Sequence, residues 1–327
     1  MSSKETILIT GGAGFIGSNL CEHFVNKGFH VVCLDNFSTG KISNIEALLN
    51  NKNFKLIEGD IRKISDCQKA IQNCNYVLHQ AALGSVPRSI NDPITTNEVN
   101  ISGFLNMLNV SKDAGVKRFV FAASSSTYGD SEKLPKVENI IGNPLSPYAV
   151  SKYVNELYAN VFHKIYGIET IGLRYFNVFG RKQDYNSVYA AVIPKFINLF
   201  LQLKSPQING DGTNSRDFTY IDNVIQMNEL ALFTENKDAI GNVFNTAVGE
   251  QTSLNQMVDL LKKYLSNYIP EINNVPIIYG DQRSGDVLHS LASIDKAKNI
   301  LGYSPSHSFI NGLKESIAWY VNSMKDE

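Results

Sequence analysis

The fold is decided near the N-terminus by residues 6–20, TILITGGAGFIGSNL. A short apolar run at 6–10 leads directly into a glycine-rich turn, and an amphipathic segment follows at 15–27. Gly11, Gly14 and Gly17 have the spacing of a dinucleotide-binding turn, where glycine permits a tight turn, close approach of a pyrophosphate and close packing of helix on strand. The helix N-terminus adds N–H donors and a partial positive charge. This stretch therefore predicts a strand–turn–helix unit that binds the phosphates of a dinucleotide.

The alternation of strand and helix patterns continues through the first half of the chain. Further short apolar runs lie at 30–34, 54–57, 76–79, 118–122 and 169–173, and longer amphipathic segments such as 97–114 and 147–166 lie between them. Short buried strands that alternate with helices are typical of βαβ units with right-handed crossovers. We therefore expect an α/β fold with a doubly wound parallel sheet of at least six strands, of the Rossmann type.

After about residue 175 this alternation breaks down. Loop-like stretches at 180–187, 209–216 and 281–286 are mixed with helical patterns at 254–265 and 310–324. A helix followed by a strand returns at 220–247, with the strand at 242–246, so this segment is expected to rejoin the sheet. We predict a nucleotide-binding domain of residues 1–175 plus about 219–248, and a smaller α/β substrate domain of about 176–218 and 249–327.

Composition excludes several classes of protein. The 327 residues contain 30 Lys+Arg and 31 Asp+Glu, so there is no basic excess for nucleic-acid binding. No stretch of about 20 apolar residues could span a bilayer, and the run at 6–10 is too short for a signal peptide. The four cysteines form no CxxC pair. We expect a cytoplasmic protein with no membrane or nucleic-acid partner, no disulfide framework and no metal site.

Two acidic residues follow predicted strands. Asp35 ends the second strand, where a carboxylate can accept hydrogen bonds from the adenosine ribose and repel a 2′-phosphate, which favours NAD over NADP. Asp35 could instead cap the next helix. Asp60 and Ile61 follow the third strand, where they would meet the adenine or form a simple turn.

A Tyr-x-x-x-Lys pattern supplies the candidate chemistry. Tyr148 and Lys152 share one face of a predicted helix, and a cation beside a phenol lowers its pKa from about 10. The pair would then act as a general acid/base near neutral pH. Three serines at 124–126, at the end of a predicted strand, would hold the substrate oxygen whose proton Tyr148 takes.

These motifs together resemble the extended short-chain dehydrogenase/reductase family, and within it the nucleotide-sugar 4-epimerases. The chain looks like bacterial UDP-N-acetylglucosamine 4-epimerases of the WbpP type. The resemblance spans the chain and is carried by GGAGFIG (11–17), DNFSTG (35–40), GDIR (59–62), HQAALGSVPRSINDP (79–93), AASSSTYGD (122–130), SPYAVSKYVNE (146–156), LRYFNVFGRKQ (173–183), INGDGTNSRDFTYIDN (208–223) and RSGDVLHS (283–290).

The resemblance implies transient oxidation at C4 of the sugar by a tightly bound NAD. Tyr148 would move the proton, Lys152 would also hold the nicotinamide ribose, and Ser124 matches the catalytic serine. Ser125 and Ser126 remain competitors for that role. The implied cofactor-binding residues are Gly11, Gly14, Phe15, Ile16, Asp35, Asn36, Ser38, Gly40, Asp60, Ile61, Gln80, Ala81, Ala82, Tyr148, Lys152 and Tyr175.

The resemblance also implies a substrate site. Guanidinium groups match phosphate oxygens, so Arg216 and Arg283 are the expected diphosphate clamps. Ser290 stands where related epimerases carry a bulky or a small residue, and its small size leaves room for a 2-N-acetyl group. The full implied set is Gly84, Ser85, Ser124, Ser125, Ser126, Tyr148, Asn177, Val192, Gln207, Asn209, Arg216, Arg283 and Ser290.

The resulting prediction is an NAD-dependent 4-epimerase that interconverts UDP-N-acetylglucosamine and UDP-N-acetylgalactosamine. UDP-N-acetylglucosaminuronate 4-epimerase is the main alternative. An NAD-dependent sugar-nucleotide dehydratase is less favoured because residues 124–128 contain no carboxylate. The resemblance further implies a homodimer formed by the segments 97–114 and 147–166, and a structural role for Asn100 at a helix kink.

Overall fold

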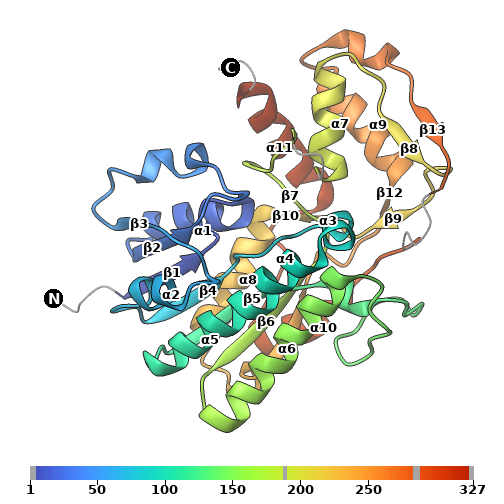
Figure 1. Cartoon of the computed structure of the whole chain (residues 1–327). Coiled ribbons are helices and arrows are strands. Elements are labelled where there is room, and N and C mark those ends of the chain that lie inside the picture. The colour runs from blue at the N-terminus through green and yellow to red at the C-terminus, as the bar shows by residue number, and fades with distance from the viewer. Residues whose placement is uncertain (1–4, 187–189, 283–287, 324–327) are drawn as a thin grey trace.

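A sheet of seven parallel strands forms the centre of the N-terminal part of the chain (Figure 1). A computed structural model describes residues 5–186, 190–282 and 288–323. The strand order is β11-β6-β5-β4-β1-β2-β3, and the predicted doubly wound parallel sheet is confirmed. The strands are β1 (Thr6–Thr10), β2 (His30–Asp35), β3 (Phe54–Glu58), β4 (Tyr76–His79), β5 (Arg118–Ser124), β6 (Thr170–Tyr175) and β11 (Asn242–Thr246).

Helices cover both faces of this sheet because its strands are apolar on both sides. In β1, Ile7 and Ile9 belong to one buried cluster and Leu8 to the other. The first cluster packs against α1 (Phe15–Asn26) and α8 (Ile221–Phe233). The second packs against α2 (Ile64–Ala70), α5 (Phe104–Asp113) and α6 (Pro147–Tyr166).

The segment predicted as one helix over 97–114 is divided into three. It consists of α4 (Pro93–Asn97), a π-helical turn η3 (Glu98–Gly103) and α5, and it is preceded by α3 (Val86–Asn91). Asn100 lies in the π turn, where its Oδ1 accepts from Leu83 N (2.8 Å) and its Nδ2 donates to Ser151 Oγ (3.1 Å). A buried amide that needs partners outside the helix accounts for the wide turn.

Two sheet strands extend further than their apolar runs. β5 continues to Ser124 and β6 to Tyr175, and these two residues are paired in register. Strand pairing carries the ladder past the last large apolar side chain. The serine loop η4 (Ser125–Tyr128) therefore begins directly at the carboxyl edge of the sheet.

The C-terminal part combines helices with short strand pairs. Its helices are α7 (Val192–Leu201), α9 (Leu254–Leu265), α10 (Asp295–Leu301) and α11 (Phe309–Ser323). Figure 1 shows α7, α9 and α11 gathered on one side, with β8 and β13 near their outer edge. The strand pairs are β7 (Val178–Phe179) with β10 (Thr219–Tyr220), β9 (Ser215–Arg216) with β12 (Thr252–Ser253), and β8 (Gln207–Asn209) with β13 (Ile278–Gly280). Short 3₁₀ turns lie at Ile42–Asn44, Glu46–Leu48, Lys237–Ala239 and Pro270–Asn274.

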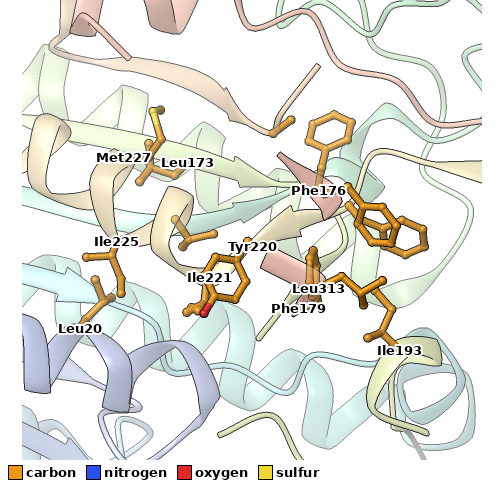
Figure 2. Packing of buried hydrophobic residues seen from close by; sticks show 14 of the residues in the cluster. Leu20, Leu173, Phe176, Phe179, Ile193, Tyr220, Ile221, Ile225, Met227 and Leu313 are labelled. Atoms are coloured by element: carbon orange, nitrogen blue, oxygen red, sulfur yellow. The ribbon is translucent and has the colours of Figure 1, made fainter. Parts of the chain in front are cut away.

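The return of residues 242–246 to the sheet is observed, since β11 pairs with β6. The domain boundaries themselves remain a prediction. One apolar core joins the two parts, because Phe176, Phe179, Tyr220 and Leu313 pack in one buried cluster (Figure 2). The rings of Phe179 and Tyr220 lie 5.7 Å apart. Within the described ranges, no helix has the length and apolar character needed to cross a bilayer.

Candidate active site

The glycine turn lies where the chain crosses from one half of the sheet to the other. β1 lies between β2 and β4, and ligands of doubly wound sheets bind at the carboxyl ends of strands at such a switch point. Gly11 has φ +66°, and a Cβ added there would lie 2.8 Å from the backbone N of Ala81. A Cβ at Gly17 would lie 2.1 Å from Gly11 O. The backbone conformation and the contacts therefore both require glycine at this turn.

The N-terminus of α1 carries no competing negative charge. Gly14 is the N-cap residue, it supplies no side-chain cap, and the first turn contains no acidic side chain. The N–H groups of a first helical turn have no partner within the helix and attract anions. This end of α1 therefore suits the diphosphate of a dinucleotide.

Asp35 connects the glycine turn to the loop that follows β2. It is 7% exposed, its Oδ2 accepts from Ala13 N (2.9 Å) and its Oδ1 accepts from Phe37 N (2.8 Å). Gly40 lies against it, since an added Cβ would come within 2.9 Å of Asp35 Oδ1. Asp35 thus joins the glycine turn to the loop after β2 by hydrogen bonds. Each of its carboxylate oxygens keeps a second lone pair that can accept from a ribose hydroxyl.

A cavity of about 310 Å³ lies over the carboxyl ends of these strands. Most of the predicted cofactor residues line it, namely Gly11, Gly14, Phe15, Ile16, Asp35, Asn36, Ser38, Asp60, Ile61, Gln80, Ala81 and Ala82. Gly40 lines an adjoining cavity of about 610 Å³. The residues present therefore fit a dinucleotide.

Other residues of the cavity were missed from sequence. Thr39 lies within the DNFSTG stretch and could have been included. Val99 reaches the cavity from the π turn, and nothing in its sequence position indicates this. Gly84, which was predicted to contact the sugar, lines both cavities.

Asp60, which was predicted to meet the adenine, is held in a polar network. Arg62 Nη2 donates to Asp60 Oδ2 (2.6 Å), and Asn36 Nδ2 donates to the same oxygen (3.1 Å). The hydrogen bonds from Arg62 lower the pKa of Asp60 to about 2, so Asp60 is ionised at neutral pH.

Tyr148 and Lys152 lie in the first two turns of α6. Ser146 caps this helix by accepting from Ala149 N (3.1 Å), and Pro147 occupies its first position. Lys152 is 3% exposed and donates from Nζ to Ala122 O (2.8 Å) at the end of β5. Burial lowers the pKa of Lys152 to about 8.

Among the three serines, Ser124 is the one whose side chain acts on Tyr148, since it lowers the pKa of the Tyr148 hydroxyl against the larger effect of burial. Ser126 donates to Ser124 Oγ from both its backbone N (3.1 Å) and its Oγ (2.9 Å). This geometry favours Ser124 over Ser125 and Ser126 as the serine nearest to the acid/base.

The predicted lowering of the tyrosine pKa is wrong for this structure. The pKa of Tyr148 lies above its usual value, because burial disfavours the phenolate more than the hydrogen bond with Ser124 favours it. The ammonium group of Lys152 is directed to a backbone carbonyl instead. Helical spacing gives a shared face, but the competition between burial and charge depends on the tertiary environment.

Tyr175 belongs to a ring of three polar side chains. Its hydroxyl donates to Gln80 Oε1 (3.0 Å) and accepts from Asn228 Nδ2 (2.9 Å), and Gln80 Nε2 donates to Asn228 Oδ1 (3.2 Å). Tyr175 and Gln80 were both predicted to hold the cofactor. Asn228 was missed, because it comes from α8 and no spacing in the sequence connects it to β4.

On the substrate side, the structure brings the segment of Arg216 beside that of Ser290. Ser290 N donates to Ser215 O (3.1 Å), and Arg216 Nη1 donates to Leu288 O (3.1 Å). Ser290 is 8% exposed. Arg283, the second predicted clamp, lies outside the described residues.

The remaining predicted substrate residues lie on separate elements. Asn177 follows β6, and its Nδ2 donates to Asp217 O (3.1 Å). Ser85 caps α3 by accepting from Arg88 N (3.2 Å). Val192 begins α7, and Gln207 and Asn209 lie at the two ends of β8.

A second group of polar side chains lies outside this site. Asp222, His307 and Glu315 each offer one ligand atom within 4.8 Å of the others. Arg181 Nη1 donates to Asp222 Oδ1 (2.7 Å), and His307 Nε2 lies 3.0 Å from Glu315 Oε1. These atoms already have hydrogen-bond partners, so the group supports no metal assignment.

Comparisons with known proteins agree with this geometry. The profile of the NAD dependent epimerase/dehydratase family matches residues 7–247. A putative UDP-glucose 4-epimerase of Methanocaldococcus jannaschii is 36% identical over 319 residues, which cover 97% of this chain and 99% of the relative.

Two solved structures are similar over nearly their whole length. A UDP-N-acetylglucosamine 4-epimerase from Methanobrevibacter ruminantium, in complex with UDP-N-acetylmuramic acid, superposes with a TM-score of 0.90 at 36% identity and covers 98% of this chain and 100% of its own. A UDP-glucuronic acid 4-epimerase from Bacillus cereus, with UDP-glucuronic acid and NAD, gives 0.88 at 33% identity and covers 97% and 99%.

Proposed function

Because the chain belongs to the NAD-dependent epimerase/dehydratase family, with UDP-sugar 4-epimerases among its full-length relatives, we propose that it interconverts UDP-N-acetylglucosamine and UDP-N-acetylgalactosamine. The observation that carries the reaction type is the buried arrangement of Tyr148 and Lys152 on α6, where Lys152 Nζ donates to Ala122 O (2.8 Å) at the end of β5 and the Ser124 side chain at that strand end favours the Tyr148 phenolate. The observation that carries the sugar is the small, buried Ser290.

C4 of a hexose has no acidic hydrogen, so inversion requires oxidation rather than proton abstraction. NAD held by the glycine turn and Asp35 would supply the reversible hydride acceptor that such an oxidation needs. Tyr148 takes the 4-hydroxyl proton and later gives it back, as a general base and then a general acid. Ser124 is proposed to hold that oxygen by a hydrogen bond, and Lys152 to hold the nicotinamide ribose.

Inversion further requires that the oxidised sugar turn over while its nucleotide stays bound. The diphosphate is therefore the natural pivot. Arg216 is proposed to bind it, and Arg283 would do so from the segment at 283–290. Asn177, Val192, Gln207 and Asn209 are proposed to hold the nucleotide, with Gly84 and Ser85 beside the sugar.

The main alternative is a UDP-N-acetylglucosaminuronate 4-epimerase. Arg88 lines the larger cavity together with Gly84, and a guanidinium group there could bind a C6 carboxylate. A dehydratase is disfavoured, because it needs an acid/base pair of carboxyl groups in the serine loop. Residues 124–128 contain none, and Arg174 already binds the nearby Glu156 (2.7 Å).

The outer face of α6 supports a homodimer. Apolar side chains recur there at intervals of four and seven residues and are exposed by nearly half or more. Those of α3 and α4 extend the patch, which comprises Val150, Leu157, Val161, Ile165, Ile90 and Ile94. A helix normally buries such a stripe. We propose that a second copy covers it. We also propose that the protein acts in the cytosol, where its four buried thiols stay reduced.

The proposal is tested by supplying each UDP-N-acetylhexosamine separately to the purified protein without added cofactor. NMR should show both reactions converging on one mixture, because NAD is regenerated in each cycle. If neither sugar reacts but the matching uronic acids do, the sugar assignment is wrong. A 4-keto-6-deoxy product, or net accumulation of NADH, would exclude epimerisation.

A further inference from the structure

Asp217 is a fully buried carboxylate that the reaction does not use. It lies between β9 and β10 and is 0% exposed. Its Oδ1 accepts from Val248 N (3.0 Å), and its Oδ2 accepts from Gly249 N (3.0 Å) and Ala292 N (3.3 Å). Burying a carboxylate that is paired only with neutral donors costs free energy of folding, which indicates that Asp217 has a specific role.

Three of the segments that meet at Asp217 carry proposed substrate contacts. Arg216 is its neighbour in the chain, and Asn177 Nδ2 donates to its backbone oxygen (3.1 Å). Ala292 lies two residues after Ser290. One residue therefore connects the proposed diphosphate clamp and the proposed nucleotide contact, through its backbone, with the segment of the residue proposed to select the sugar, through its side chain.

The same carboxylate fixes one end of the segment 288–292. Nearer the other end, Ser290 N donates to Ser215 O and Arg216 Nη1 donates to Leu288 O, so both bonds join this segment to β9 (3.1 Å each). The hydrogen bond to Ala292 is thus one of the ties that hold Ser290 beside β9. Lys136 also holds this segment, through bonds to Leu291 O (2.7 Å) and from Ser293 N (2.9 Å), so loss of the bond to Asp217 would loosen the segment beside Arg216 without detaching it.

We propose that Asp217 is a positioning residue for the UDP-sugar, whose ionised carboxylate holds Arg216 and the Ser290 segment in the binding arrangement. The inference rests on the proposed function, since it takes these residues as substrate contacts. Asp217 itself need not touch the substrate.

Ionisation of Asp217 makes this arrangement dependent on pH. Burial raises the pKa of Asp217 to about 6, against the opposing effect of its three backbone hydrogen bonds. Below that pH one carboxyl oxygen of Asp217 carries a proton and becomes a weaker acceptor of hydrogen bonds from the backbone N–H groups. The charged or titratable groups around it are Glu250 on the next segment, Tyr303 from the α10–α11 connection, the adjoining Arg216 and His289 beside Ser215.

The test measures the Kd of UDP-N-acetylglucosamine by calorimetry from pH 5 to pH 8, with NAD content recorded for each sample. The diphosphate of this sugar nucleotide is a diester and does not titrate in that range. If the neutral form binds about tenfold more weakly than the ionised form, Kd rises about fivefold one pH unit below the pKa. Asp217→Asn should bind about tenfold more weakly at pH 7.5, show no further change toward pH 5, and keep its NAD.

His289→Gln is the matched control, because histidine side chains change charge in the same pH range. This variant should keep the pH dependence. A wild-type Kd that does not change with pH, an Asp217→Asn variant with wild-type affinity, or loss of the pH dependence in His289→Gln would each overturn the proposal.

Failure of the proposed function is distinguished by a second measurement. If the wild type binds no UDP-sugar at pH 7.5, hydrogen exchange still tests the positioning role. Asp217→Asn should then lose protection at 247–250 and 288–293, while the core strands keep theirs. Unchanged exchange in both segments would refute the role whatever the substrate is.

Discussion

Replacing Tyr148 with Phe removes one hydroxyl from the acid/base pair and little else. Without a group to move the 4-hydroxyl proton, turnover should fall by about 10²–10⁴-fold, the usual contribution of general acid–base catalysis. Because the pKa of Tyr148 is raised, the phenolate fraction grows with pH, so wild-type kcat should increase through neutral pH. The residual activity of the variant should not show this increase.

The stability cost of this substitution should be small. Ser124 loses the neighbouring Tyr148 hydroxyl but keeps two hydrogen bonds from Ser126 (3.1 and 2.9 Å). A typical hydrogen bond contributes about 0.5–1.5 kcal/mol, and no buried group is left unpaired, so the lower end applies. The corresponding change in Tm is about 2–4 °C or less.

The assay is single-turnover and steady-state NMR of both UDP-N-acetylhexosamines, with NAD content measured after gel filtration. Tyr153→Phe is the matched control on the same helix, since no hydrogen bond of its hydroxyl occurs in the part of the chain that the structure describes. It should keep wild-type turnover. Tyr148→Phe with wild-type kcat and full NAD content would refute the acid/base role, whereas loss of NAD would move the residue to cofactor binding.

Three other substitutions test separate parts of the site. Ser290→Tyr should raise KM for the acetylated sugars far more than for UDP-glucose and UDP-galactose, and equal effects on both would remove Ser290 from sugar selection. Lys152→Met should lose most activity yet keep or raise Tm at pH 7, because the pKa of about 8 shows that burial disfavours the ammonium form. Because the pKa of Lys152 is lower in the folded protein than in the unfolded chain, wild-type stability relative to Lys152→Met should improve as pH rises from about 8 toward the ordinary lysine pKa. A Tm of Lys152→Met many degrees below that of the wild type would contradict this. Gly11→Ala should lower NAD content, since the added Cβ lies 2.8 Å from Ala81 in a backbone conformation that costs alanine about 1–2 kcal/mol. Full NAD retention would disprove the tight-turn argument. Gly115→Ala, also at positive φ but with open space around it, is the control for backbone strain alone.

The sequence was most informative where function depends on local geometry. The glycine turn, the strand before it and the helix after it follow from residues 6–27 alone, because a tight turn and a close phosphate approach restrict the residue types. The π turn at Asn100 could not be read in this way. A 3.6-residue pattern continues through 97–114, and the interruption arises from hydrogen bonds to Leu83 and Ser151 on other segments.

Side-chain electrostatics were the least predictable property. The Tyr-x-x-x-Lys spacing predicts an acid/base pair but gives the wrong direction for the pKa of Tyr148, because burial is set by the whole fold. Asn228 and Asp217 show the same limitation. Asn228 joins Tyr175 and Gln80 across three elements, and Asp217 collects N–H groups from two distant segments.

The sequence by itself determined the parallel sheet, the dinucleotide turn and the candidate acid/base pair, since each depends on the order and spacing of residues within one or two elements. Only the tertiary structure decided which of three serines acts on Tyr148, how far burial shifts the pKa of each charged group, and that the segment of Ser290 lies beside Arg216. These outcomes depend on distances between elements that are far apart in the chain, and the spacing of residues along the sequence does not determine those distances.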